Sequence, residues 1–239
     1  RDVSLRVEPG QLAALVGPTG AGKTTLSYLV ARLYDVDEGA VRLDGHDVRE
    51  LTLASIPDAT AMVTQDTYLF HASARENLLY TARLLDIPRS QTGRRIMEAL
   101  ESVQLADVAD KRVATFSRGM RQRLGIAEIV MKQAEVAILD EPTSGLDPHA
   151  TFELLEMIRG LKRAGVAVLL SSHLLDRVQS VCDRVALFNK GKIALIGTVV
   201  QLANQVLGAG HPFLVEAQGT DVAAALRGVE GVEPGGVGP

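Results

Sequence analysis

Uninterrupted runs of apolar residues recur along the chain at residues 12–17, 136–140 and 166–172. Each run is followed by a short loop and then by apolar positions at helical spacing. Strands that are buried on both faces of a parallel sheet read as continuous apolar runs of this kind. The pattern therefore predicts an α/β fold with a mostly parallel central sheet.

A strict alternation of apolar and polar residues marks two stretches near the start of the chain. Residues 3–7 alternate before a Pro-Gly turn, which predicts a half-solvated antiparallel strand. Residues 40–48 alternate around an Asp-Gly dipeptide, which favours a hairpin turn. We therefore expect a small antiparallel β-subdomain beside the parallel core.

Apolar positions at helical spacing fill residues 74–109, with a break at Pro88. A further helix is expected from near Ser117 to beyond Val130. We interpret these helices as a helical subdomain inserted into the α/β core over about residues 74–133.

The domain boundaries follow from the end of the sheet pattern. A turn at residues 189–191 joins the last two expected strands, so the main domain is predicted to span residues 1–200. Residues 201–239 are interpreted as a truncated C-terminal appendage, whose Gly- and Pro-rich end predicts a partly disordered tail. The chain opens at Arg1 inside a strand-like pattern, which suggests a piece of a longer protein.

The composition of the 239-residue chain narrows the class of protein. With 46% hydrophobic and 23% charged residues, the chain can bury an ordinary globular core. A formal net charge of −4 favours no nucleic-acid partner, because such proteins usually carry a basic surface. Cys182 is the only cysteine, so it is expected to be a buried apolar residue outside any intrachain disulfide. No apolar run is long enough to span a membrane, and we expect a soluble, intracellular protein.

A glycine-rich pattern, G-x-x-x-x-G-K-[ST], follows the first apolar run and opens a helix. It comprises Gly17, Pro18, Thr19, Gly20, Ala21, Gly22, Lys23 and Thr24, with Thr25 next in the helix. Backbone N–H groups of such a loop converge on phosphate oxygens, and the start of the helix adds partial positive charge. We expect Lys23 to bridge the β- and γ-phosphates of ATP and the Thr24 hydroxyl to hold Mg²⁺. The fold is thus predicted to have a P-loop NTPase core, against the alternative of a simple glycine-rich turn.

Two adjacent carboxylates, Asp140 and Glu141, end the second apolar run. Unpaired charges near a core are costly, and a metal ion with a polarised water would account for both. We expect Asp140 to hold Mg²⁺ and Glu141 to orient or deprotonate the attacking water.

The segments around these carboxylates resemble those of the ATP-binding-cassette (ABC) ATPases, and the resemblance runs through the whole chain. Residues 142–148, PTSGLDP, look like the D-loop of that family and include Asp147. Residues 116–123 resemble its signature segment and keep Ser117 and Gly119, while Arg118 and Met120 replace a glycine and a glutamine. Ser117 is expected to cap the following helix.

Two further residues match family positions in order and spacing. Gln65 resembles the Q-loop glutamine, which contacts magnesium and couples to the membrane partner. His173, at the end of the third apolar run, resembles the switch histidine, which contacts the γ-phosphate. The resemblance implies catalytic roles for Lys23, Glu141 and His173, and nucleotide contacts by Ser117, Gly119 and Asp147.

The resemblance also implies partners. In the family two such domains meet head to tail, so that Ser117 and Gly119 would act on the ATP of the second nucleotide-binding domain. A transmembrane permease is the other expected partner, docking near residues 66–77. The protein would then lie peripherally at the cytoplasmic face of the membrane. The adenine-stacking aromatic of the family is expected upstream of Arg1.

Three classes of function remain open on the sequence. A transporter ATPase is favoured, and the alternatives are soluble cassette proteins of translation and ATPases of DNA maintenance. Residues 1–80 look like the domain of exporters that fuse permease and ATPase, whereas residues 82–239 look like separate ATPase subunits for drug, antibiotic or polysaccharide export. Both resemblances favour an exporter.

Overall fold

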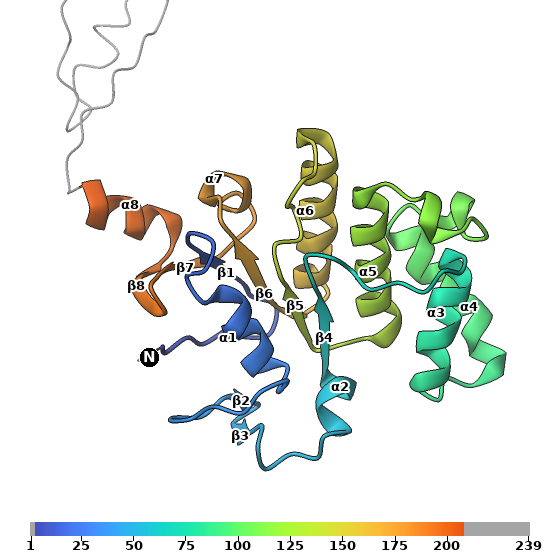
Figure 1. Cartoon of the computed structure of the whole chain (residues 1–239), viewed down its shortest axis with the longest axis horizontal. Coiled ribbons are helices and arrows are strands. Elements are labelled where there is room, and N and C mark those ends of the chain that lie inside the picture. Colours follow the sequence, from blue (N-terminus) through green and yellow to red (C-terminus); the bar gives the residue numbers. More distant parts are fainter. Residues whose placement is uncertain (1–2, 208–239) are drawn as a thin grey trace, which may run out of the picture. The chain divides into compact units, whose positions relative to one another are not determined.

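The computed structural model describes residues 3–207 and divides the chain into two units, residues 1–202 and 203–239. The fold reported below is that of the first unit (Figure 1). Of the predicted appendage at residues 201–239, only residues 201–207 are described, and the predicted disordered tail lies outside the described residues. Among the residues that are described, no helix is both long and apolar enough to cross a membrane.

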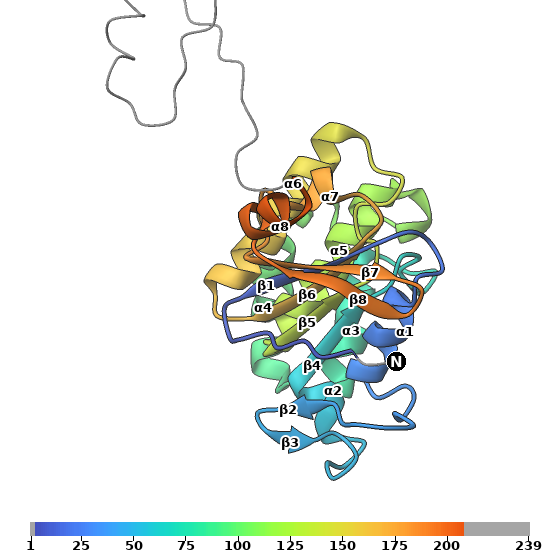
Figure 2. The same cartoon turned by 90° about the vertical axis from the view of Figure 1, so that its left-hand side faces the viewer.

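A six-stranded sheet forms the centre of the fold, with the strand order β4-β5-β6-β1-β7-β8 (Figure 2). All neighbouring strands are parallel except β7 and β8, which form an antiparallel pair. The strands are β1 (Leu12–Val16), β4 (Thr60–Val63), β5 (Val136–Leu139), β6 (Ala167–Ser172), β7 (Arg184–Asn189) and β8 (Lys192–Gly197). The predicted parallel sheet is confirmed, and its central strands are the three apolar runs.

Both faces of the central strands are buried, as the continuous apolar runs predict. In β1, Leu12 and Ala14 belong to the large core beneath the helices, while Ala13 and Leu15 belong to a smaller core on the opposite face. Burial of each large aliphatic side chain stabilises the fold by about 1.5–3 kcal/mol relative to exposure.

A two-stranded sheet of β2 (Arg42–Leu43) and β3 (His46–Asp47) forms the predicted antiparallel layer. Figure 2 shows this hairpin apart from the strands of the large sheet. The prediction of a strand at residues 3–7 is wrong. The apolar side chains of Val3, Leu5 and Val7 pack against the smaller core, but the backbone of residues 3–7 pairs with no described strand. The alternation therefore reflects burial of side chains alone.

The described helices are α1 (Lys23–Val30), α2 (Ser55–Ala59), α3 (Ala74–Leu84), α4 (Arg89–Ser102), α5 (Arg118–Lys132), α6 (Pro148–Arg163), α7 (Leu175–Val178) and α8 (Val199–Leu207). Short 3₁₀ turns lie at Ala106–Val108 and Val113–Thr115. In Figure 1, α3 and α4 lie together against α5, which itself packs on β4. The helix break at Pro88 and the helix start at Ser117 are thus confirmed.

Side-chain caps define where three of these helices begin. Ser73 and Glu76 form a reciprocal capping box on α3, and Ser117 and Asp147 cap α5 and α6. Each such cap is worth about 1 kcal/mol. Cys182 is a free thiol packed against the core, and burial raises its pKa to about 12.

Glu128 on α5 is a partly buried carboxyl away from the predicted site. Its Oε1 accepts a hydrogen bond from the Thr81 hydroxyl on α3 at 3.4 Å. Burial raises the pKa of Glu128 to about 7, although the Thr81 hydroxyl and the charge of Lys132 act in the opposite direction. The folded protein therefore keeps a proton on Glu128 at pH values where the unfolded chain has lost it.

This difference predicts a pH-dependent stability. Between the ordinary pKa of 4.5 and about 7, the free energy of unfolding should fall as pH rises, because only the unfolded state releases the proton. Glu128→Gln removes the titration. The free energy of unfolding of the variant, relative to that of the wild type, should therefore rise by about 3 kcal/mol from about pH 4 to about pH 8. Urea unfolding at the two pH values measures the gain. Glu98→Gln, an exposed glutamate on α4, is the control and should show no such gain.

Candidate functional site

The carboxyl ends of four parallel strands meet at one edge of the sheet. Gly17 follows β1, Gln65 lies two residues beyond β4, Asp140 follows β5 and His173 follows β6. Ligands of open α/β sheets bind at this edge, where loops leave the strands. Residues that are far apart in the sequence are thus brought together by strand pairing.

Two glycines give the phosphate loop its path. A side chain at Gly17 would place its Cβ 2.2 Å from the Phe188 carbonyl oxygen on β7, so only glycine fits there. Gly22 adopts φ +104°, which L residues rarely adopt. The Gly191 N–H donates to the Ala21 carbonyl and holds the loop on the β7–β8 turn.

Helix α1 begins directly behind the loop without a side-chain cap, in contrast to α3, α5 and α6. The first N–H groups of the helix therefore have no side-chain acceptor at the N-cap. Unpaired N–H groups and the helix dipole make such a start favourable for a phosphate group.

Lys23 is 5% exposed and lies inside the loop. Its Nζ donates to the carbonyl oxygens of Gly17 at 2.7 Å and Pro18 at 3.2 Å, and lies 3.4 Å from Glu141 Oε1. A buried ammonium needs such partners. The phosphate loop and the end of β5 are thereby joined through one cation.

Ser171 on β6 links the two carboxylates that follow β5. Its hydroxyl donates to Asp140 Oδ1 at 2.5 Å and accepts from the Glu141 N–H at 2.8 Å. Both Ser171 and Asp140 are buried. Glu141 itself adopts φ +49°, a strained conformation for a non-glycine residue that is found most often at functional sites.

His173 and Glu141 form a direct pair. His173 Nδ1 lies 2.7 Å from Glu141 Oε2, and the imidazole is the donor when the carboxylate is ionised. Glu141 thus lies between Lys23 and His173, each contacting a different carboxylate oxygen. The three residues predicted to be catalytic are in mutual reach.

A cavity of about 280 Å³ opens over this cluster. It is lined by Thr19, Gly20, Gly22, Lys23, Thr24, Thr25, Gln65, Glu141, Ser144 and His173. Gly17, Pro18 and Ala21 form the base of the loop, with Ala21 buried. Apart from Ser144, every lining residue is one that the sequence singled out for nucleotide, metal or catalysis.

Oxygen donors around the cavity suit a magnesium ion. Thr24 contributes a hydroxyl, Gln65 an amide oxygen, and Asp140 a carboxylate behind the cavity. Mg²⁺ prefers hard oxygen ligands and is usually held by one or two carboxylates together with phosphate oxygens and water. Across residues 3–207 no cluster of three or more His, Cys, Asp or Glu could hold a metal ion.

Three predicted nucleotide contacts outside the phosphate loop do not line this cavity. Ser117 accepts a hydrogen bond from the Met120 N–H at the start of α5, and Gly119 packs beside Leu146 and Ala150. Asp147 accepts from the Ala150 N–H, and this bond lowers its pKa. Their roles toward a nucleotide stay predictions.

Sequence reasoning missed Ser171. The available signal was a pair of serines, residues 171 and 172, at the end of an otherwise apolar run. A polar residue inside a strand that is buried on both faces needs a partner, and Asp140 on the neighbouring strand supplies it.

Residues 1–144 match the family model described as "ABC transporter". The chain belongs to the ABC transporter family. This ABC protein is an ATP-binding subunit with the P-loop ABC ATPase fold, and its activity is ATP hydrolysis coupled to transport.

The names of individual relatives of this ABC protein describe different functions. The linearmycin resistance ATP-binding protein LnrL of Bacillus subtilis (strain 168) is 31% identical over 209 residues, covering 87% of this chain and 67% of that protein. The methionine import ATP-binding protein MetN of Thermobifida fusca (strain YX) is 35% identical over 207 residues, covering 84% and 64%. A solved bacterial Atm1-family ABC exporter with ATP bound has a TM-score of 0.74 at 27% identity, covering 85% of this chain and 36% of that chain.

Removal of the Ser171 hydroxyl should weaken both the fold and the site. In Ser171→Ala, Asp140 Oδ1 and the Glu141 N–H lose their shared partner, and the free energy of unfolding should fall by about 1–3 kcal/mol. ATP turnover should also fall, because both carboxylates lose their orientation. Chemical denaturation and phosphate release measure the two effects.

Ser172→Ala is the matched control, because this equally buried hydroxyl contacts only the backbone of Leu174. It should lower stability but leave turnover per folded molecule near that of the wild type. Equal turnover in both variants would show that Ser171 has no part in the site.

Proposed function

We propose that this ABC protein hydrolyses MgATP at the cavity above the phosphate loop and drives a transmembrane permease, acting as the ATPase of an exporter. The observation that carries the proposal is the chain of contacts from the loop carbonyls through Lys23 and Glu141 to His173. These residues come from α1 and from the ends of β5 and β6, yet they converge on one cavity.

Lys23 serves as the cation for the terminal phosphates. It now contacts two backbone carbonyl oxygens and one carboxylate, all of which are weaker partners than a polyphosphate. On ATP binding its ammonium exchanges these contacts for phosphate oxygens. Glu141 is then released from Lys23 and is available to a water molecule.

Glu141 is the base that takes a proton from the attacking water. His173 holds Glu141 Oε2 and so leaves Oε1, the atom nearest Lys23, to accept the proton of the water that attacks the γ-phosphate. Thr24, Gln65 and Asp140 would hold Mg²⁺, which when bound neutralises charge on the β- and γ-phosphates. Ser171 fixes the Asp140 carboxylate in its place.

Ser117 and Gly119 act on the nucleotide of a second nucleotide-binding domain. Their absence from the lining of the cavity in their own chain supports this assignment. Ser117 places the start of α5 at the surface, where backbone N–H groups can meet a phosphate of the partner. A head-to-tail pair completes both sites, so ATP closes the dimer and hydrolysis opens it.

The segment of residues 66–77 is the docking site of the permease. Tyr68 is 84% exposed, and its ring packs edge-on against Phe70, which packs in turn against Tyr80 on α3. Exposed aromatic clusters are typical of interaction surfaces. The exporter direction is supported by the resemblance of both parts of the sequence to export ATPases, and docking would place the protein at the cytoplasmic face of the membrane.

Glu141→Gln tests the assignment of the base. The amide preserves shape but accepts no proton, so turnover should fall by roughly 10²-fold or more while ATP binding persists. With MgATP the variant should accumulate a dimer in size-exclusion chromatography coupled to light scattering. Lys23→Ala is the comparison: it should lose ATP binding and remain monomeric. Normal turnover in Glu141→Gln would remove Glu141 from catalysis.

A cysteine placed at Tyr68 tests the docking site. In a Cys182→Ala background, Tyr68→Cys should form crosslinks to an integral membrane protein when host membranes are treated with a short thiol–amine crosslinker. Leu53→Cys is the control, because Leu53 is 72% exposed but lies before α2, away from the aromatic cluster. Equal crosslinking from both positions, or crosslinking to soluble proteins alone, would contradict the assignment of the docking site.

A further inference from the structure

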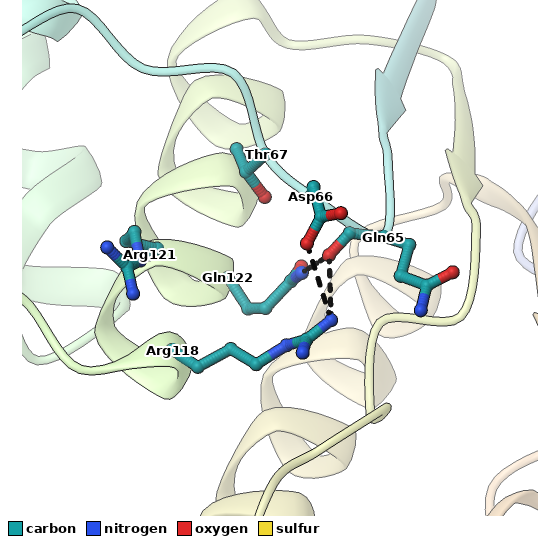
Figure 3. A pocket seen from close by; sticks show the side chains of 6 residues that line it. All are labelled: Gln65, Asp66, Thr67, Arg118, Arg121 and Gln122. Atoms are coloured by element: carbon teal, nitrogen blue, oxygen red, sulfur yellow. Dashed lines mark hydrogen bonds and ion pairs between the residues drawn. The ribbon is translucent and has the colours of Figure 1, made fainter.

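Arg118 stands where the signature segment of the family has a glycine, and its side chain reaches two other loops. The guanidinium Nη2 donates to the Gln65 backbone carbonyl at 3.4 Å and lies 3.6 Å from Asp66 Oδ1 (Figure 3). The same side chain covers Gly145 of the D-loop, where an added Cβ would lie 3.0 Å from Nη1. One residue therefore touches the Q-loop and the D-loop from the start of α5.

The Gln65 carbonyl receives a second donor from the same helix. Gln122 Nε2 donates to it at 2.9 Å, and the side chain of Gln122 is only 2% exposed. Figure 3 shows both side chains converging on the Q-loop from α5. Two donors one helical turn apart thus fix the backbone of Gln65 to α5, the helix that follows Ser117.

The side chain of Gln65 extends toward the nucleotide cavity. Its Nε2 lies 3.5 Å from the Ser144 hydroxyl, and both residues line that cavity with Glu141. The backbone of Gln65 is therefore anchored to α5 while its amide faces the nucleotide. Movement at the start of α5 would be transmitted to the amide through a single residue.

Arg121 provides an internal comparison. It lines the same small pocket as Arg118, Gln122 and residues 65–67 and carries the same charge. Unlike Arg118, it makes no hydrogen bond or ion pair with the Q-loop among the described contacts. Two arginines therefore lie near Gln65, and of the two only Arg118 contacts the Gln65 backbone.

We propose that Arg118 is a positioning residue that holds Gln65 against the D-loop, so that the Gln65 amide is in place for the metal and the γ-phosphate. The inference deepens the proposed function and rests on it, because Gln65 is taken to act on MgATP. A glycine at position 118 leaves this task to Gln122 alone. The guanidinium links the signature helix to the active site of its own chain.

Hydrogen exchange of the nucleotide-free protein tests directly whether Arg118 restrains the backbone of Gln65. In Arg118→Ala, the peptide spanning residues 64–70 should exchange roughly five-fold faster, because one of two anchors is lost. Peptides spanning the phosphate loop should be unchanged. Arg118→Lys keeps the charge but offers one compact donor group in place of a fork, and should be intermediate. Arg121→Ala is the control and should exchange like the wild type.

Steady-state kinetics test whether Arg118 affects ATP turnover through Gln65. Arg118→Ala should lower kcat roughly five-fold and raise the Mg²⁺ concentration for half-maximal activity, with KM for ATP within about two-fold. In a Gln65→Ala background the same substitution should have no further effect on kcat, because the amide through which it acts is gone. If Arg118 had only a structural role, the losses of kcat in Arg118→Ala and Gln65→Ala would be independent and would add in the double variant.

The outcomes separate the two proposals. Equal exchange in Arg118→Ala and the wild type, additive losses of kcat with Gln65→Ala, or the same changes in Arg121→Ala would each overturn the role of Arg118. A wild-type protein without ATPase activity would overturn the proposed function instead, while the exchange measurement would still decide whether Arg118 holds the Q-loop.

Discussion

Parallel pairing of β1, β5 and β6 is the constraint on which the site depends. In this register Leu139, the last residue of β5, lies beside Leu170 of β6, and Val16 of β1 lies beside Ser172. All three strands therefore end at one edge of the sheet. The phosphate loop, the two carboxylates and His173 follow those ends by one or two residues, and a slip of the register would separate them.

The polar groups of the site satisfy one another through a continuous chain. Loop carbonyl oxygens contact Lys23, Lys23 contacts Glu141, and the Glu141 N–H contacts Ser171, which donates to Asp140. This network compensates for the burial of a cation and two carboxylates, which would be costly if they were left unpaired. The same groups can exchange these partners for phosphate and metal, so the network stabilises the fold and prepares the chemistry.

Helix α5 connects this site to the rest of the molecule. Ser117 caps the start of this helix, at the surface that we propose faces a second nucleotide-binding domain, and Arg118 in its first turn contacts the Gln65 carbonyl. Further along, the partly buried Glu128 contacts Thr81 of α3. A single helix therefore links the proposed partner-facing surface, the backbone of Gln65 and the helical layer of α3 and α4.

The sequence by itself determined the parallel core, the hairpin, the helix starts and the phosphate loop, because apolar runs, turn dipeptides and capping residues act over a few neighbouring positions. It misassigned residues 3–7, where alternation reflected burial without strand pairing. Only the tertiary structure decided that Ser171 bridges Asp140 and Glu141 and that Arg118 anchors Gln65. These contacts join residues 30 or more positions apart, and their partners are selected by strand register and helix packing, which no local pattern records.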